Sequence, residues 1–321
     1  MTDTRGTFRL RQVRQDVLNK EYVPIPAVWL APSAPNTGYW MGGGPSGSSK
    51  SSVDKMNYST ETTARIPGSD ISAPKNDTGA DGSNTTGYLF YGFNGSSYFS
   101  STEKLVYSTD TRTLGGNMPQ PARSGSGVVG NNEKSLIAAG YGSPSPGSRS
   151  QIYKYTYSSD TAAAPGLTTG SIGNTFRLRG SGNQDYGYFG GQGGGAGSTM
   201  SKLTYSNDSF SIFPSSTTLS VARDGVSSCA SETGVYFSGG NPGQKTVTDK
   251  LTFATEACAR IPGANTLSGM AYQQGTGSAT KGYMLNWNST NFEKLTHSTD
   301  TYSALPSGAS LPVSKGTSFG C

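Results

Sequence analysis

One octet recurs six times along this chain, and its spacing constrains the fold more than any other feature. The octet begins with a lysine, continues through apolar and aromatic residues, and ends in a small polar turn that carries an acid. Its copies are KMNYSTET (55–62), KLVYSTDT (104–111), KYTYSSDT (154–161), KLTYSNDS (202–209), KLTFATEA (250–257) and KLTHSTDT (294–301). Successive lysines are 44 to 50 residues apart, a period that is typical of repeat architectures.

Each repeat follows the same order of segments. An aromatic strand beside glycine comes first, as in Gly187-Tyr188-Phe189-Gly190, and a Gly/Ser loop leads from it to the octet. A short segment rich in Pro, Ala and Leu follows, and then a strand of small residues such as 122–129. Four strands in about 48 residues are typical of one propeller blade. The sequence therefore predicts an all-β fold with six blades.

The residue types predict where each strand lies within a blade. We expect the small-residue strand to be innermost, because blades converge on the axis and leave room there only for Gly, Ala and Ser. The octet strand is then further out, where Leu or Met and the aromatic residue fill the space between blades. The acid of the octet turn is expected to accept hydrogen bonds from nearby backbone groups. Exposed pairs of octet lysines and acids are worth only ~0.2–1 kcal/mol each, so we expect them to order strand ends and oppose edge aggregation.

The two chain ends differ from the repeats. No small-residue strand precedes the first repeat, whereas the C-terminal stretch 314–321 supplies an extra one. We expect this C-terminal strand to join the first blade and close the ring, which removes exposed sheet edges. Residues 1–36 carry no octet and are predicted to form an extended N-terminal arm. The repeats of the predicted propeller, 37–321, cover residues 37–85, 86–133, 134–184, 185–232, 233–278 and 279–321.

Composition argues against several classes of function. The net charge of +5 is modest and dispersed, so we expect no specific nucleic-acid binding. The three cysteines form no C-x-x-C pair, which argues against a disulfide framework and a structural zinc site. Neither a long apolar span nor a signal peptide stands out, so we expect synthesis in the cytoplasm and no membrane insertion.

Residues suited to catalysis are sparse. The only histidine, His297, occupies the octet position that holds Tyr or Phe in the other repeats, which indicates a core position. The S-x-x-K matches at 52–55 and 101–104 arise because the repeat places a lysine there. The glycine-rich run 190–197 lacks the lysine-serine pair and the helix of a phosphate loop. We therefore expect no enzyme activity, no catalytic or metal-binding residue, and no cofactor.

Two regions outside the repeat pattern are candidates for binding. In the arm, apolar side chains would bury in a partner's groove while arginines pair with its acidic rim; the alternative is that the arm packs along its own domain. The predicted docking residues are Phe8, Arg9, Leu10, Arg11, Val13, Arg14, Tyr22 and Trp29. Tyr98 and Phe99 stand in a Gly/Ser loop where other repeats have small polar residues. They are candidates for surface recognition of a sugar or a protein, or for packing under their own loop.

The glycine-pair strands, the aromatic strands and the Ala-Arg dipeptides of the small-residue strands resemble kelch-type repeats from Thr37 to Cys321. A closer resemblance, carried by the arm segment 5–30 and the block 185–209, is to Gly/Ser-rich repeat proteins of cyanophage virions. This resemblance implies a virion structural protein of the phage tail or its fibres, assembled in the host cytoplasm. Its expected partners are other tail proteins, bound through residues 1–36. The alternative is a module that binds a host receptor or glycan through loops such as 96–101.

Overall fold

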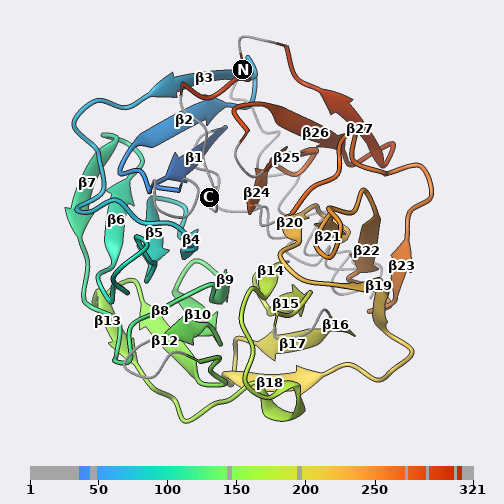
Figure 1. Ribbon diagram of the computed structural model, residues 1–321, viewed down its shortest axis with the longest axis horizontal. Helices are drawn as coiled ribbons and strands as arrows, with labels where there is room; N and C mark the ends of the chain where they lie inside the picture. The colour runs from blue at the N-terminus through green and yellow to red at the C-terminus, as the bar shows by residue number, and fades with distance from the viewer. Residues whose placement is uncertain are drawn as a thin grey trace, which may run out of the picture.

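The computed structural model describes residues 36–43, 49–142, 147–193, 197–271, 274–286, 289–306 and 309–312. These residues form β-strands and one short 3₁₀ helix, η1 (Gly170–Ile172). The strands make six sheets arranged as blades around a central axis, so the predicted all-β, six-bladed propeller is confirmed (Figure 1). The predicted N-terminal arm, apart from its last residue, and the predicted closing strand 314–321 lie outside the described residues.

The blades have these bounds. The first holds β1 (Thr37–Met41), β2 (Val53–Asn57) and β3 (Thr62–Arg65). The second holds β4 (Gly79–Gly82), β5 (Thr86–Phe90), β6 (Glu103–Val106) and β7 (Thr111–Leu114). The third holds β9 (Gly127–Gly130), β10 (Lys134–Ala138), β12 (Ile152–Thr156) and β13 (Thr161–Ala163).

The fourth blade holds β14 (Arg179–Gly182), β15 (Tyr186–Gly190), β17 (Ser201–Thr204) and β18 (Ser209–Ile212). The fifth holds β20 (Ser227–Ala230), β21 (Gly234–Ser238), β22 (Thr248–Thr252) and β23 (Cys258–Arg260). The sixth holds β24 (Gln274–Gly277), β25 (Lys281–Leu285), β26 (Phe292–Thr296) and β27 (Thr301–Ala304). Two small ribbons pair β8 (Arg123–Ser124) with β11 (Tyr141–Gly142) and β16 (Gly197–Thr199) with β19 (Thr218–Arg223).

The small-residue strand is innermost, as predicted. Strands β4, β9, β14, β20 and β24 lie side by side around the axis (Figure 1). Close approach explains their composition: a Cβ placed on Gly180 of β14 would lie 2.4 Å from Val129 Cγ1 of β9. Each of the first five predicted repeat ranges contains the three outer strands of one blade and the innermost strand of the next, so the repeats and the blades are offset by one strand.

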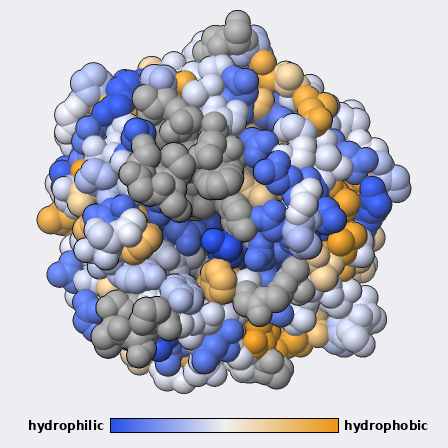
Figure 2. Space-filling view, in the orientation of Figure 1, coloured by the Kyte–Doolittle hydropathy of each residue, from blue (hydrophilic) through white to orange (hydrophobic). Residues whose placement is uncertain are grey.

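The antiparallel order of each blade gives the disc two distinct faces. The turn between the first two strands and the octet turn between the last two lie at one end of the blade, which we call the turn face. The loops from the second to the third strand and the connections to the next blade lie at the other end, the loop face. Figure 2 shows hydrophilic residues around the centre of the face in view and small, scattered hydrophobic patches.

Rings stacked across the seams between blades form much of the core. The tyrosine of the aromatic strand in one blade stacks on the octet aromatic residue of the next, with ring centroids 4.7 to 5.6 Å apart. The pairs are Tyr39–Tyr107, Tyr88–Tyr157, Tyr188–Phe253, Tyr236–His297 and Tyr283–Tyr58. The last pair joins the sixth blade to the first, so the described side chains close the ring there.

The octet charges also act across the seams. The lysine of each octet binds the acid of the next blade's octet, with Nζ to oxygen distances of 2.5 to 3.4 Å. We call these interactions clasps: Lys55–Asp110, Lys104–Asp160, Lys154–Asp208, Lys202–Glu256, Lys250–Asp300 and Lys294–Glu61. In five seams the stacked tyrosine donates its hydroxyl to the same acid. In the third blade Leu136 occupies that position, and Lys134 supplies a second ammonium to Asp208 instead.

The clasps correct two expectations about the octets. The acids receive side chains of the preceding blade instead of the backbone donors that we expected, and the charges join blades instead of only ordering strand ends. The reason is the position of the octet turn, which lies at the seam within reach of the lysine and tyrosine of the preceding blade. All six acids have φ between 50° and 53°, a left-handed conformation that Asp tolerates better than most residues.

Candidate functional site

A row of aromatic side chains crosses three blades on the loop face. Phe93 and Tyr98 come from the loop after β5, Tyr141 from the loop after β10, and Phe176 from the connection to the fourth blade. Successive ring centroids are 4.7, 6.5 and 5.6 Å apart. All four side chains are half-exposed. We call this set the aromatic row.

The loop that carries Tyr98 is held in place by its backbone. Phe93 exchanges two backbone hydrogen bonds with Asn76, of 2.8 and 3.0 Å. The Oδ1 atom of Asn94 accepts the N–H groups of Ser96 and Ser97, which forms a tight turn before Tyr98. Fixed backbone partners on both sides limit the positions that the Tyr98 ring can adopt, so little ordering entropy remains to be lost on binding.

Charged groups adjoin the row at its inner end. Arg177 lies with its guanidinium carbon 5.0 Å from the Phe176 ring centroid, and Arg179 lies 3.6 Å from a carboxylate oxygen of Asp77. Burial raises the pKa of Asp224, although the guanidinium groups of Arg177 and Arg179 oppose this shift. Rings next to paired charges are suited to binding polar ligands that also have an apolar surface.

The predicted surface residues lie in different surroundings. Tyr98 is part of the aromatic row, whereas the Phe99 ring lies over the ammonium group of Lys75, 5.5 Å from its centroid. Lys75 is itself buried in an ion pair with Glu103. Phe99 therefore lies over this buried ion pair. The eight predicted docking residues of the arm lie outside the described residues.

Sequence reasoning missed Phe93, Tyr141 and Phe176. Phe93 and Tyr141 each directly follow the glycine that ends an aromatic strand, at Gly92 and Gly140. An aromatic residue directly after this glycine in two consecutive repeats was the sequence signal that could have identified Phe93 and Tyr141. Phe176 is more than 30 residues further along the chain than Tyr141, so only the tertiary structure brings it to the row.

The lone histidine is a core residue, as predicted. His297 stacks on Tyr236 with ring centroids 5.0 Å apart, and its Nε2 lies 3.7 Å from Cys229 Sγ. Burial raises the pKa of the Cys229 thiol to about 12 and lowers the pKa of His297. Both groups are therefore neutral near pH 7, the reverse of the charged thiolate–imidazolium pair that cysteine nucleophiles need.

Across the described parts of the chain, no group of three or more His, Cys, Asp or Glu residues could hold a metal ion. Within the same residues, no helix is long and apolar enough to cross a membrane.

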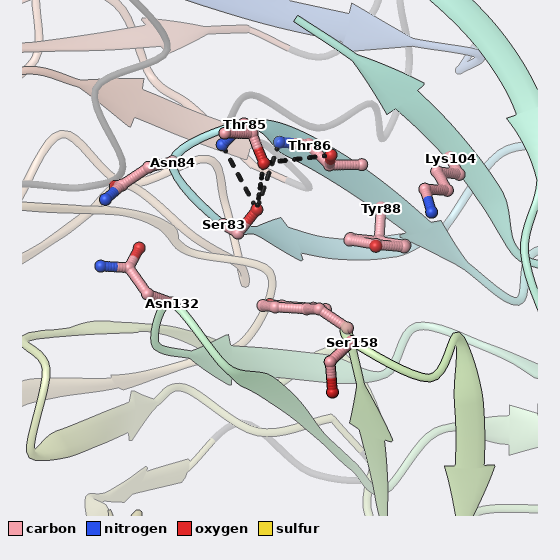
Figure 3. Close-up of a pocket in the computed structure, with 9 residues that line it drawn as sticks. Ser83, Asn84, Thr85, Thr86, Tyr88, Lys104, Asn132 and Ser158 are labelled. Carbon is pink, nitrogen blue, oxygen red and sulfur yellow. Dashed lines mark hydrogen bonds between the residues drawn. The ribbon is translucent and has the colours of Figure 1, made fainter.

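A cavity of about 400 Å³ opens between the second and third blades on the turn face (Figure 3). Its lining residues are Ser83, Asn84, Thr85, Thr86, Tyr88, Lys104, Asn132, Tyr157 and Ser158. Figure 3 shows the amides of Asn84 and Asn132 at one end, and Tyr88 and Lys104 toward the other. Most of the lining side chains carry a hydroxyl or an amide and only Lys104 carries a charge, while much of the lining surface is apolar.

Comparison with known proteins adds no assignment to these sites. No protein family matches the chain, and no curated protein matches it in sequence.

Proposed function

We propose that this chain is a non-enzymatic structural protein of a phage virion, a component of the tail or its fibres. The observation that carries the proposal is the set of six clasps, one at each seam. A ring in which a clasp ties every neighbouring pair of blades, and stacked rings reinforce five of the six seams, is a rigid disc for display. The resemblance of the chain to repeat proteins of phage virions, together with its kelch-like strands, supports a place in a phage particle.

In this proposal the N-terminal arm, residues 1–36, anchors the disc to another tail protein. The apolar residues Phe8, Leu10 and Trp29 bury in a groove of that partner, and the neighbouring arginines pair with acidic groups at its rim. The disc itself keeps all six clasps without the arm, because every clasp residue lies beyond residue 36.

The test compares the full chain with a variant that lacks residues 1–36. The truncated protein should fold, with an unfolding transition near that of the full chain, but should be missing from assembled particles. A matched control keeps the arm and replaces Arg9, Arg11 and Arg14 by lysine, which retains the charge. Normal incorporation of the truncated protein would contradict anchoring by the arm.

The chemistry of the described residues supports a role without catalysis. The nearest approach to a nucleophile and base is Cys229 with His297, and burial keeps both neutral. Incubating the chain with ester and glycoside substrates should give no turnover above that of a His297→Tyr variant. A rate that this substitution removes would overturn the non-enzymatic assignment.

The aromatic row favours a second candidate function, attachment to a host receptor or surface glycan. Four half-buried rings, placed one beside the next along the row, offer stacking surfaces for sugar rings or for a partner's side chains. Fluorescently labelled propeller should bind susceptible cells, and Tyr98→Ala should weaken that binding by about ten-fold. Leu114→Ala, which removes an exposed apolar side chain from outer strand β7, is the control. Equal binding by the two variants would exclude the row as the attachment site.

A further inference from the structure

We propose that the cavity between the second and third blades is a binding site for one neutral sugar residue. This goes beyond the structural role proposed above and concerns the turn face, at the opposite end of the blades from the aromatic row. The volume of about 400 Å³ is within the usual range for small-molecule sites, roughly 300–1,000 Å³.

One strand position contributes to the opening of this seam. The residue two places before the stacked ring is long in the third, fourth and sixth blades, where it is Lys134, Tyr186 or Lys281. Lys134 and Lys281 reach across to the acid of the next blade, and Tyr186 packs against its own blade's clasp lysine. In the second blade this residue is Thr86, whose short side chain lines the cavity. The first and fifth blades also have short residues here, Thr37 and Gly234, so the turn residues at the mouth of the seam must contribute to the opening as well.

The next seam shows a second way of filling the same space. Between the third and fourth blades, the Oε1 atom of Gln184 accepts the backbone N–H of Asn132, and the Asn131 amide donates to the Gln184 carbonyl oxygen. At the proposed site, Asn132 itself stands in the position of Gln184, one blade earlier. Within the described chain its side-chain amide and that of Asn84 make no hydrogen bond, so both are available to a ligand.

The lining chemistry selects a ligand rich in hydroxyl groups. Ser83 Oγ accepts the N–H groups of Thr85 and Thr86, at 3.3 and 3.2 Å, which fixes the hydroxyl at the edge of the cavity. Together with the two amides, these hydroxyls offer both donors and acceptors at close spacing. Sugars carry the same mixture around their rings, and an apolar C–H face that can lie against the edges of Tyr88 and Tyr157.

The charges of the site favour a neutral ligand. Lys104 is the one cation in the lining, and its ammonium is 2.5 Å from Asp160 Oδ2 in the clasp. An acidic sugar would have to compete with Asp160 for that ammonium group, and a cationic sugar would be repelled by it. A neutral sugar disturbs neither partner.

The test uses the full chain and measures binding of soluble sugars by saturation-transfer NMR. The probes are methyl glucoside, methyl galactoside, methyl mannoside and N-acetylglucosamine, with glucuronate as the acidic comparison. At least one neutral probe should bind with a Kd on the order of millimolar, as expected for a single sugar in a small polar site. Glucuronate should bind more weakly.

The key variant is Thr86→Lys, which introduces the lysine that the third and sixth blades have at the same position. Its ammonium should reach Asp160 as Lys134 reaches Asp208, so the fold should persist while sugar binding weakens at least about ten-fold. Thr113→Lys adds the same charge on the outer strand of the same blade and should bind as the parent does. Asn132→Ala offers an independent variant and should also weaken binding.

Three results would overturn the proposal. They are absence of binding by every neutral probe, undiminished binding by Thr86→Lys, and binding of glucuronate alone. Sugar binding that Tyr98→Ala removes but Thr86→Lys leaves intact would also overturn it, because the ligand would then lie on the loop face. None of these results bears on anchoring by the arm, which is measured by particle incorporation.

Discussion

The seams and the loop face use their residues in opposite ways. At the seams the same chemistry recurs: a clasp lysine binds an acid at all six, and a stacked pair of rings lies beside the clasp at five of them. On the loop face the blades differ: the second blade carries Phe93 and Tyr98, whereas the matching loop of the fifth, 239–247, has no aromatic residue. Residues that recur in every repeat hold the ring together, whereas residues that differ from blade to blade can take part in recognition.

The largest effect should come from a buried ion pair between ribbon strand β19 and strand β22 of the fifth blade. Arg223 and Asp249 are fully buried, with Nη2 2.6 Å from Oδ2. Asp249→Ala leaves an uncompensated buried charge and should lower the free energy of unfolding by about 3–5 kcal/mol. Chemical denaturation measures this loss.

Replacing both partners of this pair by leucine should recover part of that loss, because no buried charge then remains. A double variant as unstable as Asp249→Ala would show that the charge is not the cause.

A clasp should contribute less. Asp208 accepts Lys134 and Lys154, and although burial alone would raise its pKa, hydrogen bonds and attraction from the two lysines lower it overall. Asp208→Asn keeps a residue that tolerates the left-handed turn but removes the charge, and should cost about 1 kcal/mol at pH 7.

The effect of Asp208→Asn should depend on pH. A carboxylate whose pKa is lower in the folded state stabilises the fold above its unfolded pKa of about 4, and this contribution disappears as the pH falls through the folded value. The difference between the two proteins should therefore shrink toward zero in acid. Asp185→Asn, at an exposed turn, is the control. Its free energy of unfolding should stay close to that of the parent both at pH 7 and in acid.

Asp81 should behave in the opposite way. It lies on innermost strand β4, where burial raises its pKa to about 7, although the N–H of Gly82 partly opposes the shift. A raised folded pKa means that stability is complete below the unfolded value of about 4 and is lost as the pH rises through 7. Asp81→Asn should therefore stabilise the protein at pH 8, by about 1–3 kcal/mol, and leave it unchanged at pH 3.

Unfolding curves of the parent and of Asp81→Asn at pH 3, 6 and 8 would check this prediction. A stabilisation that is equal at all three values would show that packing, and not charge, is responsible.

Tyr98→Ala should have the smallest effect on stability. The ring is half-buried and its ring contacts are with Phe93 and Tyr141 of the row, so the free energy of unfolding should change by less than about 1 kcal/mol. Thermal unfolding beside the cell-binding assay separates the two roles. A loss as large as that of a clasp variant would mean that the row belongs to the scaffold.

Local pattern was enough to predict the architecture. Six octets predict six blades, the small residues of β4 and β9 predict innermost strands, and the tyrosine position of His297 predicts a core histidine. Each of these depends on residue size and on alternation along a strand, which act within a few residues and are visible in the sequence.

Only the tertiary structure decided which residues meet. Lys104 and Asp160 are more than 50 residues apart, and the octet pattern alone does not say whether a lysine turns to its own acid or to the acid of the next blade. For the same reason, only the structure shows that Phe176 meets Tyr141, and that Lys134 reaches Asp208 across the next seam whereas Thr86 lines an open cavity. Such contacts depend on how neighbouring sheets twist and pack, and that geometry comes from the closed ring as a whole.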